Sequence, residues 1–424
     1  MNDKAKSFVG TSLGHFVNDG CGFIFPVVYP LLVSSYSIST LGVALLATLL
    51  NLSQVAASPF IGRKTDSSRN YSGLISLGII LVGAGVAGYG ISILFFRDNF
   101  LLMLLILWTT IAGFGTAFFH PISATILKEK FDSRSRGRVL GMGGSIGSTG
   151  RAIFPLIAIL LITSYSISSL LILSGAAIVS GIIVFLIMRN VHFLSDQDVN
   201  KEVSGSQQNG PTRFPMSILV RGIFPLLILS IARGAFAQGI IQFIPVYLNT
   251  VVHIQYGYEL GLSFTLMLAM GIIGQPLFGY LADRFGRRLV MGVANGGGVI
   301  SMLMFLVYGN HYYSEILLAA FGLFTLSAYP LLFGLATDVA PEGAATVTGS
   351  LVWSVGNIGG SSIGPLLVGL LAQRYFLGSL TYAFYAMCAI GVFSVILLPL
   401  VKPAEYFHSY QDNIRAGRQS DSGK

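Results

Sequence analysis

The chain reads PLFGYLADRFGRR over residues 276–288, and it reads PFIGRKTDSSR over residues 59–69. Three residues keep their relative places: Pro59, Gly62 and Asp66 recur as Pro276, Gly279 and Asp283, each 217 positions later. Each stretch ends an apolar run that is long enough for a membrane helix. The repeat therefore predicts a membrane protein built from two similar halves, an organisation typical of secondary transporters.

The composition also places the chain in a lipid bilayer. Of its 424 residues, 53% are hydrophobic and only 10% are charged, and the mean hydropathy is +0.75. So few polar residues could not cover the surface of a soluble globule. The chain is therefore expected to lie mostly inside the membrane.

Twelve apolar runs are long enough to cross a hydrocarbon core of about 30 Å. They lie at roughly residues 8–34, 41–61, 74–96, 100–127, 139–164, 168–187, 223–247, 260–281, 289–308, 316–337, 345–371 and 380–401. Lipid offers the backbone no hydrogen-bond partners, so we expect helices, and the alternation typical of a β-barrel is absent. The predicted fold is an all-α membrane protein, with twelve transmembrane helices in two pseudo-symmetric six-helix bundles.

A polar segment divides the two bundles. Residues 190–215 are too polar to insert and too short to fold alone, so they are predicted to form a flexible cytoplasmic linker. This division gives an N-terminal bundle at residues 1–189, a C-terminal bundle at residues 216–403 and a cytoplasmic tail at residues 404–424.

The basic residues predict the orientation. With both termini in the cytoplasm, 21 of the 25 Lys and Arg lie in cytoplasmic segments, and only Arg97 and Arg374 lie outside. We therefore expect a multi-pass protein of the cell (inner) membrane with cytoplasmic N- and C-termini. This asymmetry and the anionic lipid of the inner leaflet account for the net charge of +8, so we expect no nucleic acid partner.

Asp19 lies near the middle of the first predicted span. A carboxylate there costs about 2.5 to 3.5 kcal/mol to insert, and protonation removes that cost. His15, Asn18 and Asp19 share one helical face, which predicts a proton-coupling site. The alternative is a hydrogen-bonded pair that only fixes helix packing. A His and Asp metal site that includes His120 has no specific spacing, so we expect no metal.

Arg151 lies near the centre of the fifth span, on one face with Gly144, Gly147 and Ser148. These small residues should bring a neighbouring helix close to the guanidinium. Its planar donors suit a carboxylate, a phosphate or a phosphonate, so we expect it to bind an anionic group of a substrate. The alternative is an ion pair with Asp19, and both interpretations hold if the substrate anion and Asp19 compete for Arg151.

Arg233 is a second central cation, in the seventh span. An ideal helix places it far around from Gln238 and Gln242, unless Gly234 and Gly239 unwind the turn. Without that break, Arg233 would tie the two domains together. The other substrate-binding candidates are polar or aromatic residues of the second, eighth, tenth and eleventh spans: Gln54, Gln275, Tyr329, Trp353 and Asn357.

The repeated stretches predict a cytoplasmic latch that gates transport. A glycine allows another helix to approach closely, and the acid can meet a helix N-terminus or a flanking arginine. The residues concerned are Gly62, Asp66 and Arg69 in the first copy and Gly279, Asp283, Arg284 and Arg287 in the second. The alternative is that they are solvated loop charges that only follow the topology.

The second copy resembles the signature of the major facilitator superfamily between its second and third helices. Three further segments are similar to the fosmidomycin-resistance branch of exporters: GHFVND at residues 14–19, FHP at 119–121 and GNIG at 356–359. The chain departs from that branch at Ile122, where an acid often follows the proline, and at Arg151, where a proline is expected. The resemblance implies the major facilitator fold, export, and a part for His120 in proton coupling.

We expect a secondary active transporter that works by alternating access and exports a small amphipathic or anionic compound against protons. The alternative within transport is uptake or exchange of an anionic metabolite, such as a carboxylate or a phosphate ester. The alternative of another class is a non-transporting membrane sensor. The sequence has no phosphate-binding glycine loop and no nucleophile with a paired base, so we expect no enzyme, no catalytic residues and no cofactor. The expected partners are a small-molecule substrate, protons and the lipid bilayer, and we expect a monomer.

Overall fold

The structure is a computed structural model that describes residues 2–68, 70–193, 216–309, 313–340, 345–375 and 378–401. Within these ranges, the structure does not describe the side chains of residues 59, 62–68, 133, 134, 136, 137, 216–222, 345, 346, 357 and 358. Most of the predicted linker, the predicted tail and Arg69 therefore lie outside the described residues. The surroundings of Gly62 and the side chain of Asp66 are not described either.

The described part of the chain is helical and contains twelve candidate membrane spans, which confirms the predicted fold class. The N-terminal half contains α1 (Asp3–Gly22), α2 (Ile24–Ser34), α3 (Thr40–Ser68), α4 (Tyr71–Phe95), α5 (Asp98–Lys130), α6 (Ser133–Tyr165), a 3-10 turn (Ile167–Ser169) and α7 (Leu170–Met188). The C-terminal half contains α9 (Met216–Thr250), α10 (Tyr258–Phe285), α11 (Arg287–Tyr308), α12 (Ser314–Asp338), α13 (Ala345–Leu351), α14 (Gly359–Leu370), α15 (Leu380–Ile396) and a 3-10 turn (Leu398–Leu400).

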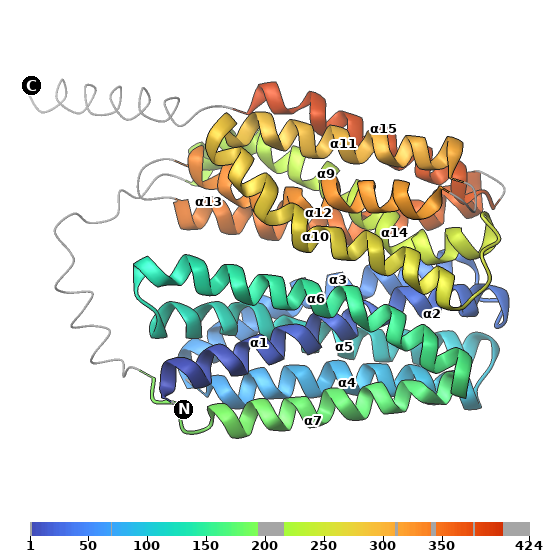
Figure 1. The fold of residues 1–424 in the computed structure, drawn as a ribbon, viewed down its shortest axis with the longest axis horizontal. Helices are drawn as coiled ribbons and strands as arrows, with labels where there is room; N and C mark the ends of the chain where they lie inside the picture. The colour runs from blue at the N-terminus through green and yellow to red at the C-terminus, as the bar shows by residue number, and fades with distance from the viewer. Residues whose placement is uncertain are drawn as a thin grey trace, which may run out of the picture.

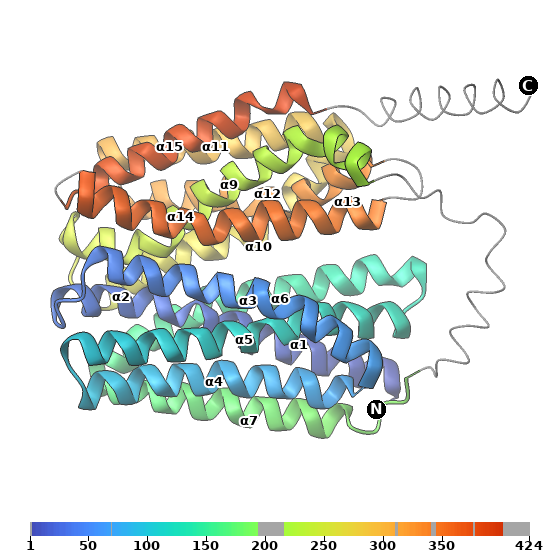
Figure 2. The same ribbon diagram turned by 180° about the vertical axis from the view of Figure 1, so that it is seen from behind.

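The helices form two bundles that lie side by side (Figure 1). Helices α1 to α7 make one bundle and α9 to α15 make the other, and Figure 2 shows the same division from behind. We call the end where α1 begins and α7 ends the near end, and the end where α2 ends and α3 begins the far end. In Figure 1 the near end lies on the left.

The two halves are held together at the far end. Three hydrogen bonds join described residues of opposite halves, and each has at least one partner in the far-end part of its helix. The Thr48 hydroxyl donates to the Ser362 carbonyl over 3.0 Å, and the Thr265 hydroxyl donates to the Ala152 carbonyl over 2.7 Å. The third joins the Leu41 N–H to the Gln373 side-chain carbonyl, over 3.0 Å.

The apolar core repeats this pattern. One cluster of buried side chains runs through the N-terminal half and continues into the far-end part of the C-terminal half, where Phe243 and Phe264 belong to it. A separate cluster fills the near end of the C-terminal half and includes Phe278 and Leu331. The core is therefore continuous across the halves at the far end and divided at the near end.

Two of the predicted single helices are irregular. The first span is interrupted at Phe23, which separates α1 from α2. The eleventh span contains two π-helical segments, Val352–Ile358 and Leu371–Tyr375. Near the first segment, the Ser230 hydroxyl of α9 donates a hydrogen bond of 3.2 Å to the Val352 carbonyl. A partner from another helix thus supports a carbonyl in this wider turn.

Candidate transport site

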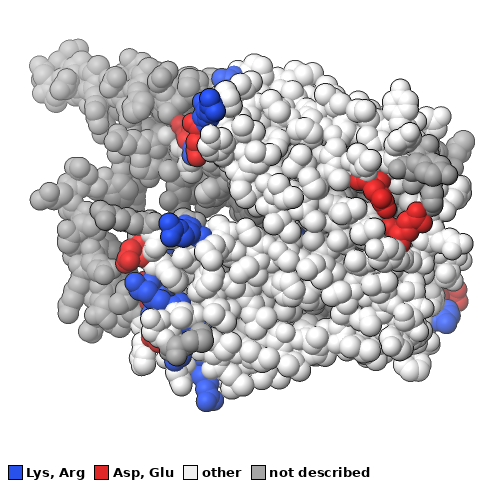
Figure 3. All heavy atoms as spheres, in the orientation of Figure 1, with Lys and Arg blue, Asp and Glu red and all other residues white. Residues whose placement is uncertain are grey.

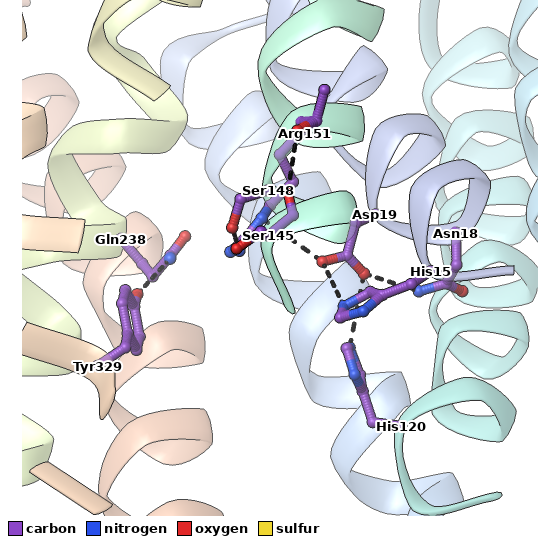
Figure 4. Close-up of polar contacts among 10 residues, drawn as sticks. His15, Asn18, Asp19, His120, Ser145, Ser148, Arg151, Gln238 and Tyr329 are labelled. Atoms are coloured by element: carbon purple, nitrogen blue, oxygen red, sulfur yellow. Dashed lines mark hydrogen bonds and ion pairs between the residues drawn. The ribbon is translucent and has the colours of Figure 1, made fainter. Parts of the chain in front are cut away.

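Asp19 is the centre of a polar cluster on α1 (Figure 4). Its Oδ2 lies 3.3 Å from His15 Nε2 and 3.5 Å from Arg151 Nε, and its Oδ1 lies 3.7 Å from His120 Nε2. The amide of Asn18 donates a hydrogen bond of 3.1 Å to Oδ1. The structure therefore brings together the four residues predicted for proton coupling and places a permanently charged guanidinium beside them.

Two glycines of α6 allow α1 to approach closely enough to form this cluster. A Cβ built on Gly147 would overlap the His15 ring, and a Cβ built on Gly150 would overlap the main-chain carbonyl of Phe16. Small residues let membrane helices pack with their backbones close together. This approach carries Arg151, the neighbour of Gly150 on α6, to the carboxylate on α1.

Arg151 lies between that carboxylate and a hollow at the boundary of the two halves. Its Nη2 donates a hydrogen bond of 2.8 Å to Ser148 Oγ, one turn earlier on α6, and 25% of its side chain is exposed. The hollow measures about 210 Å³, counted with the open space at its mouth, and is lined by Ser148, Arg151, Leu268, Gly271, Gln275 and Leu326. Two predicted substrate residues, Arg151 and Gln275, thus face one space from opposite halves. Gly144, predicted at a helix contact, lies beside open space instead.

His120 is the most accessible member of the Asp19 cluster. Its side chain is 46% exposed, against 10% for Asp19. The ligand atoms of His15, Asp19 and His120 lie within 4.8 Å of one another, a geometry that could hold a metal ion. The guanidinium of Arg151 already faces the same carboxylate, and its charge would repel a divalent cation. The arrangement therefore disfavours a divalent metal ion at this cluster.

Arg233, predicted to bind substrate, is buried inside the C-terminal half. It is only 1% exposed, and its Nη2 donates a hydrogen bond of 2.9 Å to the Thr325 carbonyl on α12. Its guanidinium carbon lies 4.2 Å from the centre of the Tyr329 ring. These contacts stay within the C-terminal half, so the predicted interdomain tie is wrong. Helix α9 also runs unbroken through Gly234 and Gly239, so the predicted unwinding is wrong as well.

Tyr329 connects Arg233 to Gln238 and Gln242. From the sequence, only a break in the helix could bring these residues together. The Gln238 amide donates a hydrogen bond of 2.6 Å to the Tyr329 hydroxyl, and the Gln242 amide lies 3.4 Å from Gln238 Oε1. The Trp353 ring lies 6.5 Å from the Tyr329 ring and is 40% exposed. Four of the predicted substrate residues of the C-terminal half therefore form one connected group, with Trp353 at its edge.

Among the described candidates, one is not part of either cluster. Gln54 is half-buried on α3, and no described hydrogen bond joins its side chain to the other candidates. The side chain of Asn357 lies outside the described residues.

At the near end, the described gating residues are arranged differently from the predicted latch. Arg287 forms an ion pair with Asp338, at the end of α12, and also donates a hydrogen bond of 3.3 Å to the Gly334 carbonyl. The guanidinium carbon of Arg284 lies 5.4 Å from the centre of the Phe285 ring. Asp283 is exposed, and no described ion pair includes it. Gly279 lies beside open space, and none of the described helices approaches it.

Thr325 and Asp338 were missed from the sequence, and Ser148 was predicted only as a small packing residue and not as a partner of Arg151. Asp338 carried a signal, because it is an acid at the end of a predicted span, on the side of the membrane where the arginines after the repeat are also predicted to lie. Ser148 and Thr325 carried none, because serine and threonine are common in membrane helices.

A family model described as Major Facilitator Superfamily matches residues 11–350 and 257–420. The chain belongs to the major facilitator superfamily. Its members are transporters, so this chain is a transporter and not an enzyme. The twelve spans make it a multi-pass membrane protein.

Relatives and solved structures agree with this family. The chain is 24% identical over 380 residues to the Fosmidomycin resistance protein of Escherichia coli (strain K12), a match covering 88% of each chain. It is 32% identical over 168 residues to the multidrug resistance protein MdtG of Serratia proteamaculans (strain 568), which covers 38% of this chain and 40% of that one. The fold is shared with a bacterial homolog of the human lysosomal transporter Spinster, which was solved in an inward-facing and unoccupied conformation. The TM-score is 0.70 at 15% sequence identity, and the match covers 94% of this chain and 95% of that one.

Proposed function

We propose that this major facilitator protein couples the protonation of Asp19 to the export of a small amphipathic compound. The observation that carries the proposal is the position of Arg151, with Nε 3.5 Å from Asp19 and a side chain that also lines the hollow between the halves. The export direction is supported by the names of two relatives, which are resistance proteins.

Protonation of Asp19 changes what Arg151 can do. While the carboxylate is charged, the two residues neutralise each other, and an apolar body can lie beside them in the hollow at little electrostatic cost. A proton on Asp19 leaves the guanidinium without its counter-ion, and a free cation at the wall of the hollow disfavours an apolar occupant. Proton and amphipathic substrate therefore oppose each other, which is the condition for exchange in opposite directions.

The second candidate function is uptake or exchange of an anionic metabolite, and the same contact favours it. An anion that binds Arg151 must displace Asp19, and the displaced carboxylate is then most stable when it is protonated. Anion and proton would support each other's binding, which is the condition for transport in the same direction. The charge of the substrate at Arg151 thus decides between the two candidates.

We also propose that the near end faces the cytoplasm of a cell whose inner membrane holds this protein. The support is the distribution of charge, because Lys and Arg gather at the near end (Figure 3). With this orientation, the contacts between the halves close the outer side and leave the protein inward-facing.

A proteoliposome assay tests both candidates. Vesicles that contain the protein and a pH-sensitive dye are challenged with neutral amphipathic compounds and with organic anions, each with and without a proton gradient. Proton movement opposite to the compound supports export, and proton movement with an anion supports the second candidate. Substrate-dependent signalling without movement of any compound would support the sensor class instead.

A further inference from the structure

Thr48 and Thr265 occupy equivalent places in the two halves. They are 217 positions apart, the same interval that separates Pro59 from Pro276. Each threonine donates its hydroxyl hydrogen bond to a main-chain carbonyl of the opposite half, Thr48 to Ser362 over 3.0 Å and Thr265 to Ala152 over 2.7 Å. The duplication has thus produced two equivalent contacts across the boundary between the halves.

The surroundings of the two threonines are also related. Ala44, one turn before Thr48, packs against Gly369, where a Cβ would overlap the alanine methyl group. Gly261, one turn before Thr265, packs against Leu156, whose Cδ1 lies 2.9 Å from a Cβ built on that glycine. The tight packing brings α3 to α14 and α10 to α6. Thr48 is buried as a result, and its hydroxyl needs a protein partner.

We propose that Thr48 and Thr265 are paired latches, which hold the far end closed and set the ratio between the two conformations of the transporter. When the far end opens, each hydroxyl loses the carbonyl of the opposite half. It can then bond to the carbonyl four residues earlier in its own helix, as threonine commonly does. Thr110 shows that arrangement in this chain, with a hydrogen bond of 2.8 Å to the Ile106 carbonyl.

The exchange of acceptors keeps the latch reversible. No hydroxyl is left unsatisfied in either conformation, so each threonine contributes to the cost of opening only the difference between two hydrogen bonds. This difference is expected to change the ratio of conformations by about two- to fivefold for each threonine. Because the two contacts lie on different helix pairs, the effects should multiply when both are removed.

The test measures distances across both ends of one helix pair by double electron-electron resonance in nanodiscs. Cys21 and Cys388, both buried, are first replaced by alanine. Spin labels at Tyr165→Cys and Tyr258→Cys report the far end, and labels at Leu140→Cys and Phe285→Cys report the near end. All four label positions are exposed, and each pair joins α6 to α10.

Thr48→Val and Thr265→Val should each move population from the short to the long far-end distance, with the opposite change at the near end. The double variant should show the product of the single effects, and Thr48→Ser should behave as the wild type because it keeps the hydroxyl. Thr163→Val is the matched control, since the Thr163 hydroxyl bonds to the Ile159 carbonyl of its own helix over 2.9 Å.

Three results would overturn the proposal. The first is a set of valine variants with the distance distributions of the wild type. The second is an effect from only one threonine, which would show that the contacts do not act as a pair. The third is an equal effect from Thr163→Val, which would show a general response to loss of a hydroxyl. Unfolding temperatures of all variants identify any that fail to fold, and Thr48→Ser and Thr265→Ser then keep the comparison possible.

Discussion

At the scale of single residues, the site depends on one arginine that has two possible partners. Arg151 is oriented by Ser148 toward Asp19, yet it also lines the hollow between the halves. The sequence predicted both the ion pair and the substrate contact without choosing between them. Only the structure shows that one side chain can reach both places.

Replacement of Asp19 by asparagine keeps the size of the side chain and removes its titration. Asp19→Asn should therefore lose accumulation driven by a proton gradient and retain exchange of labelled for unlabelled substrate. Transport of both kinds is measured in proteoliposomes of equal protein content. Gradient-driven accumulation at the wild-type level in this variant would end the case for Asp19 as the proton site.

Replacement of Arg151 distinguishes its two partners. If it contacts an anionic group of the substrate, Arg151→Lys should weaken binding and Arg151→Ala should weaken it by about ten- to a hundredfold. If it only neutralises Asp19, the double variant Arg151→Ala with Asp19→Asn should recover the binding, because no buried charge is then left alone. Binding titrations on the purified single and double variants decide between these outcomes.

At the scale of helices, glycines decide which elements meet. The sequence predicted a close contact along the small residues of α6, and Gly147 lies at it. It could not predict that Gly150 faces α1 while Gly144 faces open space, because the spacing of small residues does not specify the neighbour. Similarly, the sequence of α9 does not show that Tyr329 of α12 lies beside it. The sequence therefore suggested a broken helix, whereas in the structure the Tyr329 side chain connects Arg233 to Gln238.

The contact at Gly150 predicts a large difference between two similar substitutions. Gly150→Ala places a methyl group against the Phe16 carbonyl, which should cost about 1 to 3 kcal/mol of stability and should separate Arg151 from Asp19. Gly141→Ala, also on α6 but beside open space, should be close to neutral. Thermal unfolding in detergent measures both. Equal losses in the two variants would contradict the assigned packing.

At the scale of the whole molecule, the fold was predictable and the conformation was not. Twelve apolar runs and a repeat of 217 residues were enough for a two-bundle transporter, because helix formation in lipid depends on local composition. Which end is closed depends on small differences among many contacts between helices far apart in the sequence. Thr48 and Thr265 illustrate this, because nothing in the sequence marks either residue before the structure shows the carbonyl of the opposite half that accepts its hydrogen bond.

The orientation and conformation proposed above would make Trp353 accessible from the cytoplasmic side of the membrane. Trp353 is 40% exposed beside Tyr329. A single cysteine introduced as Trp353→Cys, with the native Cys21 and Cys388 replaced, should react with a membrane-impermeant thiol reagent applied to inverted vesicles and remain protected in right-side-out cells. The parent chain without cysteine is the control. Faster labelling from outside the cell would reverse the proposed orientation or conformation.

Arg233 gives the C-terminal half an electrical property that the N-terminal half lacks. No described carboxylate contacts this guanidinium, whereas Arg151 has Asp19 as its counter-ion. A full elementary charge crossing the membrane field changes energy by about 2.3 kcal/mol per 100 mV, and rocking of the bundle would carry Arg233 through a fraction of that field. Transport should therefore depend on membrane voltage, and Arg233→Gln should reduce that dependence in proteoliposomes polarised with valinomycin and potassium. The resting potential of the cell would then favour one conformation over the other, without adding a driving force, because Arg233 returns to its starting place in each cycle.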